Sequence, residues 1–355
     1  MHDIKCTTAA RQTRGTAVVA SALSLALLLG TSQDDALAGQ AGNINLETMG
    51  AYAFSGTVLS NPAGQTLHCD HGYAEYFTPV GSKKLPIVMW HSSSSKTWQT
   101  TFDGREGWQP IFLRRGFPVY IIDLPRQGRA SWGCEQVPAN ELPTIGRDQT
   151  SFSGFRFGTW TPPAPPVWFP GVQEPQTEAV LNEMARTRYP ELNGATFEQF
   201  ESDAVSVLLN KVGPAILIGH SGSGRRTMWT ALKNPNVKGI VNVEGSQLFP
   251  VGEAPAGQTT VPEAEFMKLT KIPILIILGD YLNLTPNGLA SIANAKAFVQ
   301  AVTNRGGTAE LLYLPERGIF GNTHFSMSDL NNVQVADLVS DFFKRTGLDA
   351  NQKKK

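Results

Sequence analysis

Ala215-Ile-Leu-Ile-Gly-His-Ser-Gly-Ser-Gly224 is the segment of the sequence that decides the fold. Its first four residues form a short apolar run, which predicts a buried strand, and Arg225–Leu232 is expected to be a helix. Between them, Gly219–Ser223 has the pattern small-x-Ser-x-small, in which serine replaces the last glycine of the usual turn. Such a turn raises the central hydroxyl, here that of Ser221, above the end of a sheet. The alternative is a Gly/Ser-rich loop without special chemistry.

Similar apolar runs recur along the chain and alternate with amphipathic segments. Near-continuous apolar strands that alternate with helices are typical of a parallel sheet covered on both faces. We therefore predict an α/β fold, a mostly parallel sheet with helices on both faces. The expected strands are Leu85–Trp90, Pro118–Asp123, Gly239–Val243, Pro273–Leu278 and Ala309–Leu314, and the expected helices are Glu106–Arg115, Phe197–Lys211, Ala293–Asn304 and Val333–Lys344.

The segments before the first buried strand follow another pattern. Tyr52–Leu59 and Gly72–Val80 alternate between apolar and polar residues, and the turn Asn61–Gly64 follows the first of them. This arrangement predicts an N-terminal antiparallel hairpin at the edge of the sheet. Gly39–Gly50 is expected to be a flexible leader, and Gly245–Thr270 a loop.

A long segment of about residues 132–192 interrupts the alternation of strands and helices. A compact α/β core does not need so long a connection between two strands. We interpret this segment as a cap insertion over the carboxyl end of the sheet. Its aromatic residues are expected to line an apolar pocket, and the alternative is that they form a small core of the cap itself. They are Phe155, Phe157, Trp160, Trp168 and Phe169.

The first 38 residues have the features of a secretory signal. A basic start, Lys5–Arg14, is followed by the apolar stretch Thr16–Gly30 and by the small-residue site Ala36–Ala38. The apolar stretch is too short for a membrane span, so we expect the signal to be cleaved. We expect export by a Sec-type route and a mature chain that begins at Gly39. The alternative is an uncleaved signal anchor. Residues 39–355 would then form a single domain, secreted or periplasmic, with no membrane span after cleavage.

Charge and cysteine content narrow the expected partners and the compartment. The chain has 30 basic and 30 acidic residues, which gives no indication of nucleic acid as a partner. Of its three cysteines, Cys6 lies in the signal, and Cys69 and Cys134 remain. We predict that these two form a disulfide in an oxidising compartment, with two separate buried thiols as the alternative. His68 and His71 flank an aspartate, but no further ligands lie near them in the sequence, and we expect no metal site.

Four residues that suit acyl-transfer chemistry follow predicted strands. They are Ser221, Glu244, Asp280 and His324. A serine hydroxyl needs a base to take its proton, and the base needs an acid to orient it. Active groups of doubly wound sheets lie at the carboxyl ends of the strands, and the order Ser, acid, His is that of α/β-hydrolases. On these grounds either Glu244 or Asp280 can be the acid that orients the histidine, and in α/β-hydrolases the acid more usually lies at the Asp280 position.

Several segments resemble a small group of secreted bacterial α/β-hydrolase esterases. The resemblance lies in Trp98–Trp108, Phe155–Gly158, Val243–Gly245, Gly321–His324 and Asn331–Leu338. It implies an α/β-hydrolase fold and a Ser-Glu-His triad of Ser221, Glu244 and His324, with Asp280 as the alternative acid.

The sequence departs from that group in the loop expected to bind the oxyanion. The group has glycine and then two cysteines after the histidine, whereas this chain has His91-Ser92-Ser93-Ser94. We expect the oxyanion hole to consist of the backbone N–H groups of Gly222 and Ser93, with Ser92 as the alternative to Ser93.

These features predict a serine hydrolase that cleaves small-molecule carboxylic esters without a metal or organic cofactor. A lactonase, thioesterase, acyltransferase or peptidase would use the same triad, and a non-catalytic binding protein on this fold is a further alternative. His220 is expected to pack locally. Arg225 and Arg226 are expected to pair with carboxylates or, alternatively, to bind an acidic substrate. The acyl and alcohol preference and the oligomeric state, a dimer included, stay open.

Overall fold

The computed structural model describes residues 42–91, 94–130, 132–135, 144–189, 192 and 194–352. The signal expected in residues 1–38 and the loop residues Ser92 and Ser93 lie outside this part. The chain from Asn43 onward forms one unit.

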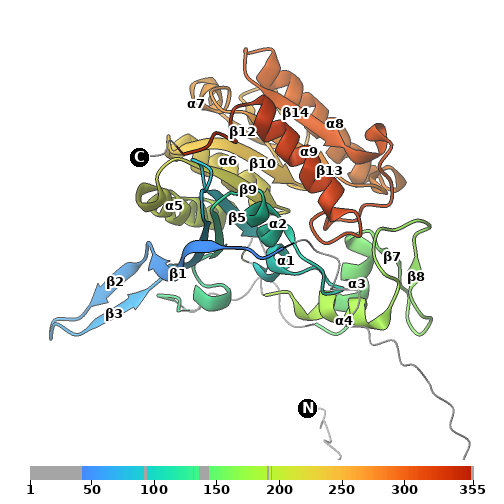
Figure 1. The fold of residues 1–355 in the computed structure, drawn as a ribbon, viewed down its shortest axis with the longest axis horizontal. Coiled ribbons are helices and arrows are strands. Elements are labelled where there is room, and N and C mark those ends of the chain that lie inside the picture. Colours follow the sequence, from blue (N-terminus) through green and yellow to red (C-terminus); the bar gives the residue numbers. More distant parts are fainter. Residues whose placement is uncertain are drawn as a thin grey trace, which may run out of the picture. The chain divides into compact units, whose positions relative to one another are not determined.

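An eight-stranded sheet forms the centre of this unit, in the order β1-β4-β6-β5-β9-β10-β13-β14 (Figure 1). From β6 to β14 each strand is parallel to its neighbours, and only β4 runs against the strands beside it. The predicted mostly parallel α/β sheet is therefore confirmed. The strands are β1 (Leu46–Phe54), β4 (Gly72–Pro79), β5 (Ile87–His91), β6 (Val119–Asp123), β9 (Ala215–His220), β10 (Val237–Val243), β13 (Ile274–Leu278) and β14 (Ala309–Tyr313).

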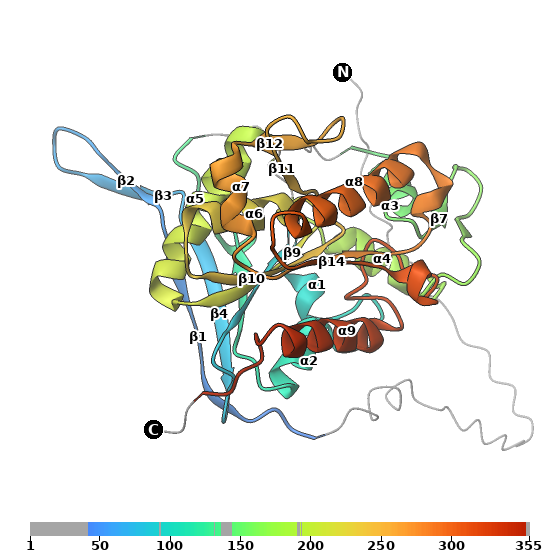
Figure 2. The same ribbon diagram turned by 90° about the horizontal axis from the view of Figure 1, so that it is seen from above.

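Helices cover both faces of the sheet, as Figure 2 shows. Successive side chains of a strand point to opposite faces. In β5, Ile87 and Met89 therefore join one apolar cluster and Val88 and Trp90 the other. One face carries α1 (Lys96–Gln99), α2 (Trp108–Arg114) and α9 (Asn332–Arg345), and the other carries α5 (Ala195–Val212), α6 (Ser223–Lys233), α7 (Glu263–Leu269) and α8 (Pro286–Thr303). Short 3-10 turns lie at Gly128–Ala130, Leu282–Leu284 and Leu314–Arg317.

The N-terminal region differs in detail from the prediction. The expected antiparallel edge is present, because β1 pairs with β4. However, β1 begins at Leu46, inside the segment expected to be a flexible leader. Ser55 and Gly56 have φ angles of 57° and 111° and end β1, so the predicted strand Tyr52–Leu59 is divided between two strands. The turn Asn61–Gly64 instead joins a separate exposed hairpin, β2 (Thr57–Ser60) and β3 (Thr66–Cys69), which projects from the sheet in Figure 1.

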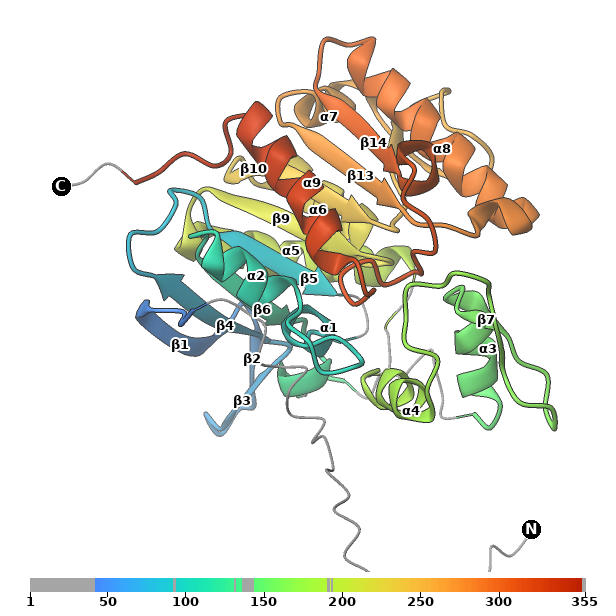
Figure 3. The same ribbon diagram turned by 45° about the vertical axis from the view of Figure 1, so that its right-hand side comes forward.

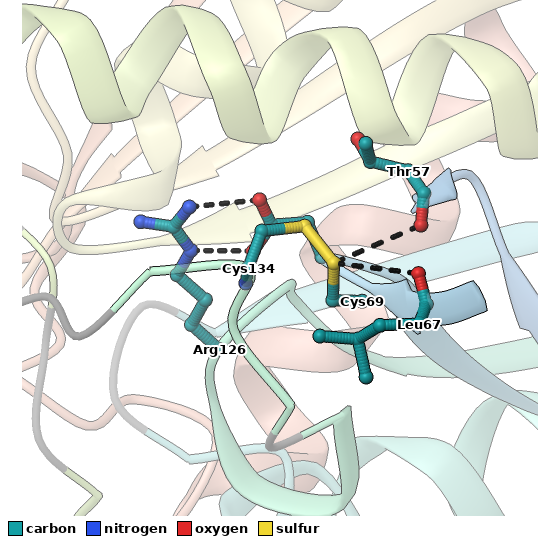
Figure 4. The surroundings of a disulfide bond; sticks show 6 residues. Thr57, Leu67, Cys69, Arg126 and Cys134 are labelled. Carbon is teal, nitrogen blue, oxygen red and sulfur yellow. Dashed lines mark hydrogen bonds and ion pairs between the residues drawn. A yellow bond between two sulfur atoms is a disulfide. The ribbon is translucent and has the colours of Figure 1, made fainter. Parts of the chain in front are cut away.

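A disulfide joins Cys69, at the end of β3, to Cys134, at the start of the insertion. The predicted pairing is therefore confirmed. Beside this bond (Figure 4), the Arg126 side chain pairs with Asp70 at 2.6 Å, and the backbone N–H of Cys134 donates to the same carboxylate at 3.1 Å. These contacts fix the base of the hairpin to the chain that follows β6.

The insertion has short elements of its own, which Figure 3 brings forward: α3 (Arg147–Gly154), β7 (Gly158–Thr159), β8 (Val167–Trp168) and α4 (Glu178–Arg186). Phe157 and Trp168 pack against Phe152, and Trp160 meets Phe152 edge-on at 5.8 Å. Phe157, Trp160 and Trp168 thus follow the alternative expectation, a small core of the insertion, and Phe157 also contacts Phe102 and Phe325 outside it. Phe169 contacts Tyr281 at 4.7 Å.

The segment expected to be a loop, Gly245–Thr270, is also more ordered than predicted. It contains β11 (Leu248–Pro250), β12 (Thr259–Val261) and α7. Phe266 and Leu269, three residues apart on α7, are buried against the sheet, and this burial stabilises a helix too short to persist alone. None of the helices in the described part of the chain combines the length and apolar character that a membrane crossing requires.

Candidate active site

Ser221 lies on the tight turn between β9 and α6, with a φ angle of 54°. A side chain at Gly219 would come within 2.6 Å of Thr227 on α6, and one at Gly224 within 2.3 Å of Asn242 on β10. Small residues are required there because the helix backbone passes directly over the strands. The predicted strand–turn–helix is present, and its serine is held in a left-handed conformation that costs about 1–2 kcal/mol for a residue with a side chain.

The hydrogen bonds of the sheet continue into the residues after β9 and β10. Ser221 donates its N–H to Val243 O at 2.9 Å, and Glu244 donates its N–H to Ile277 O at 2.9 Å. Ser221 and Glu244 therefore follow neighbouring strands at the same edge of the sheet. Glu244 also has a left-handed backbone, with a φ angle of 58°.

The Glu244 carboxylate is almost fully buried and lies beside the histidine of the last loop. Its Oε2 is 3.5 Å from His324 Nδ1, and its Oε1 forms an ion pair with Arg156 Nη2 at 2.8 Å. Oε1 also accepts the N–H of Gly279, where an added Cβ would lie 3.0 Å from that oxygen. Burial acts to raise the Glu244 pKa, but Arg156, His324 and the Gly279 N–H outweigh it, so the net pKa shift is downward.

His324 is held by its backbone as well as by its ring. Its N–H donates to Phe155 O at 3.0 Å, and its carbonyl accepts from His220 Nε2 at 2.7 Å. The rings of His324 and Phe155 stack with centroids 5.2 Å apart and planes 6° apart. The expectation that His220 packs locally is confirmed, and burial lowers its pKa well below the ordinary value.

Asp280, the alternative acid, has other partners. Its Oδ1 accepts the N–H of Tyr281 at 2.6 Å, and its Oδ2 accepts the N–H of Gly321 at 2.8 Å. Both carboxylate oxygens thus hold the backbone of the loops that follow β13 and β14. The structure brings Glu244, and not Asp280, to the Nδ1 side of His324.

A buried carboxyl group that the sequence did not single out supports the histidine loop. Asp329 accepts hydrogen bonds from the Thr323 N–H at 2.9 Å, the Thr323 hydroxyl at 2.8 Å and the Asn322 amide at 2.8 Å. Burial raises its pKa to about 7, and a second buried carboxyl group, Glu174 of the insertion, interacts with it electrostatically. No motif marks these positions, because their burial depends on segments far apart in the sequence.

Of the loop expected to bind an oxyanion, the structure describes the two ends, His91 and Ser94. His91 ends β5, and its Nδ1 accepts the N–H of Ser94 at 2.9 Å. Burial lowers the His91 pKa to about 3, with contributions from the charges of His324 and Arg188. Gly222 lies at the start of α6, next to Ser221, where a backbone N–H is not used within the helix.

The remaining predicted residues have structural partners. Arg225 pairs with Glu198, and the fully buried Arg226 pairs with Glu201 at 2.8 Å. The expected pairing with carboxylates is therefore confirmed for both arginines. Among the described residues, no group of three or more His, Cys, Asp and Glu side chains could hold a metal ion, and this holds around His68 as elsewhere.

A cavity of about 480 Å³ opens on the insertion. It is lined by residues within 144–155 and by Arg188. Phe155 belongs both to this lining and to the stack on His324, so the cavity adjoins the candidate site. The Arg188 guanidinium lies over the Phe155 ring at 5.0 Å and donates to Ser151 at 2.8 Å.

Comparison with known proteins agrees with this fold. A solved structure of a novel bacterial esterase superimposes with a TM-score of 0.73 at 29% sequence identity, over 86% of this chain and 98% of that one. The chain is an α/β hydrolase related to esterases. The hydrolase is also 26% identical over 311 residues to a probable secreted lipase, phiG, of Fungal sp. (strain ATCC 74256), which corresponds to 75% of this chain and 84% of the lipase. No family model matches the chain.

Proposed function

We propose that this α/β hydrolase cleaves carboxylic esters through an acyl-enzyme intermediate, with Ser221 as nucleophile, His324 as base and Glu244 as the acid that orients the base. The observation that carries the proposal is the 3.5 Å approach of Glu244 Oε2 to His324 Nδ1, at the strand end next to the Ser221 turn. The similarity to an esterase and to a probable secreted lipase supports ester cleavage.

In the proposed reaction, His324 Nε2 takes the proton of the Ser221 hydroxyl as Oγ attacks the ester carbonyl. The Glu244 carboxylate stabilises the imidazolium that forms. The tetrahedral intermediate then collapses, and the leaving alcohol takes the proton from Nε2. Water attacks the acyl-enzyme by the same route, giving the acid and returning the proton to Ser221.

The negative charge on the carbonyl oxygen needs hydrogen-bond donors. We assign this role to the backbone N–H groups of Gly222 and Ser93, with Ser92 as the alternative to Ser93. One such donor contributes about 2.7–4 kcal/mol of transition-state stabilisation. The Ser94 bond to the His91 ring holds the end of that loop close to β5.

The insertion of about residues 132–192 is assigned as a cap whose cavity beside Phe155 accommodates part of the ester. Secretion is part of the proposal, since a disulfide is present and one relative is a probable secreted lipase. We expect cleavage of the signal after Ala38. N-terminal sequencing of the exported protein tests this, and a mature protein that still begins at Met1 would contradict it.

The test of the nucleophile is Ser221→Ala. We expect its turnover of p-nitrophenyl esters to fall by about 10⁴-fold or more, because the remaining groups only bind and polarise the substrate. Labelling by a fluorophosphonate probe should also disappear, whereas Ser291→Ala on the surface of α8 keeps both. Unchanged turnover in Ser221→Ala would reject the assignment, and an added alcohol that captures the acyl group would indicate an acyltransferase.

A further inference from the structure

Arg156, a residue of the insertion, contacts the carboxylate that faces the histidine. Its Nη2 lies 2.8 Å from Glu244 Oε1, and its Nε donates to the backbone carbonyl of Asp280 at 2.8 Å. The Arg156 side chain is 12% exposed and that of Glu244 is 3% exposed, so solvent screens this ion pair little. One guanidinium thereby joins the insertion to the ends of β10 and β13.

Phe155, the residue before Arg156, contacts the proposed base, His324. Phe155 O accepts the backbone N–H of His324, and the Phe155 ring stacks on the imidazole. Two consecutive residues of the insertion thus hold the two residues that the proposed reaction pairs as acid and base. The insertion is therefore bonded to the reacting groups, and does not only cover them.

The backbone of Arg156 is held in an unfavourable conformation. Its φ angle of 66° lies in the left-handed region, which glycine adopts without cost and arginine does not. Residues held in this way often lie where the side chain has a function. Here the conformation directs the Phe155 carbonyl to His324 while the next side chain reaches Glu244.

We propose that Arg156 is a positioning residue of the ester hydrolase: it occupies Oε1 of the ionised Glu244 carboxylate and so directs Oε2 to His324 Nδ1. This inference rests on the function proposed above. A carboxylate has two oxygens, and the Arg156 side chain and the Gly279 N–H both engage the same one. That leaves Oε2 for the imidazole and fixes the rotation of the carboxylate.

The charge of Arg156 has a second, measurable consequence. Loss of a neighbouring cation makes it easier for the Glu244–His324 pair to bind a proton, whichever partner takes it. The other titratable groups that face the pair are His220 from β9 and His91 from β5, and burial keeps both imidazoles neutral through their lowered pKa values. Asp329, which supports the His324 loop, also faces Arg156, whose charge acts to lower its pKa, so the substitution acts to raise the Asp329 pKa as well.

The test compares Arg156→Gln, Arg156→Lys and the matched control Arg115→Gln. Arg115 also joins two elements through a carboxylate, Asp337, and a backbone carbonyl, that of Ala336, but it lies between α2 and α9. We expect kcat of Arg156→Gln to fall about 10²-fold with little change in KM. The lysine variant should recover part of this loss, and the control should keep the kcat of the original protein.

The pH profile separates positioning from a general loss of structure. Since the base must be neutral, the acid limb of kcat/KM in Arg156→Gln should move about one unit to higher pH, and in Arg115→Gln it should not move. A fall in kcat with an unmoved acid limb, or an unchanged kcat, would overturn the proposal. If Arg156→Gln does not fold, the second readout is the kcat of Arg156→Ala, measured with and without added guanidinium. If folded Arg156→Ala gains no activity from guanidinium, this result counts against the inference.

The two proposals fail in different ways. Activity that survives Ser221→Ala would reject the proposed function itself. Activity that disappears in Ser221→Ala but is indifferent to Arg156 would reject the positioning role alone.

Discussion

The ends of β10 and β13 carry one carboxylate each, and the structure uses the two differently. Glu244 and Asp280 follow adjacent parallel strands of similar apolar character. Glu244 directs its carboxylate inward to His324 and Arg156, whereas Asp280 uses both oxygens to bind the backbone N–H groups of Tyr281 and Gly321. Adjacent strand ends are therefore not equivalent: the longer side chain, in a left-handed backbone conformation, reaches the histidine, and the shorter one stabilises the loops.

The largest expected difference in kcat is between the variants that lack the Glu244 carboxylate and the Asp280 carboxylate. Glu244→Ala should lower kcat by about 10⁴-fold, because the imidazole loses the group that orients it and stabilises its charge. Asp280→Ala should change kcat far less and lower the free energy of unfolding by about 1–3 kcal/mol, since two backbone N–H groups lose their acceptor. Ester kinetics and thermal unfolding of both variants measure this. A crippling loss of kcat in Asp280→Ala alone would mean that the acid is wrongly assigned.

A second comparison sets Glu244 against Asp329, the buried carboxyl group of the histidine loop, because their pKa values shift in opposite directions. The lowered pKa of Glu244 contributes stability above the ordinary pKa of a glutamate, and this contribution is lost as pH falls through the folded value. Burial raises the Asp329 pKa from 3.8 to about 7, so its contribution is present at low pH and is lost as pH rises through about 7.

We therefore expect the Tm of the original protein to decrease from about pH 4 to about pH 7, and Asp329→Asn to flatten this decrease. The charged groups facing Asp329 are Glu174 of the insertion and Arg156, so Glu174→Gln should flatten the same decrease in part. Thermal unfolding across this pH range measures both. If the curves of Tm against pH for Asp329→Asn and the original protein run parallel, the Asp329 carboxyl group does not titrate in this pH range.

The smallest effect on turnover is expected from the disulfide, since neither of its cysteines belongs to the candidate site. The bond closes a loop with a sequence separation of 65. Replacing both cysteines by alanine should lower the free energy of unfolding by about 4 kcal/mol on chain-entropy grounds. At a temperature where the variant stays folded, kcat should be unchanged. A large fall in kcat there would show that the disulfide also positions the insertion over the site.

The sequence predicted the sheet, the Ser221 turn and the Cys69–Cys134 bond, because each leaves a local or compositional pattern. It was less successful with segments whose structure depends on packing. α7 forms where the sequence suggested a loop, since Phe266 and Leu269 become buried. The sequence left open whether the rings of the insertion line a pocket or form a core, because aromatic content alone does not indicate what a ring packs against, and Phe157 and Trp168 pack on Phe152.

By itself, the sequence determined that a serine, two carboxylates and a histidine follow strands of one parallel sheet, because strand periodicity and strand direction are written in local residue patterns. Only the tertiary structure decided that Glu244, and not Asp280, faces His324. It also decided that Arg156 of the insertion pairs with the other carboxylate oxygen of Glu244, Oε1. The physical reason is that these contacts join residues far apart in the chain. Their geometry depends on backbone conformation at the strand ends and on how the insertion packs, and neither leaves a mark in the local sequence.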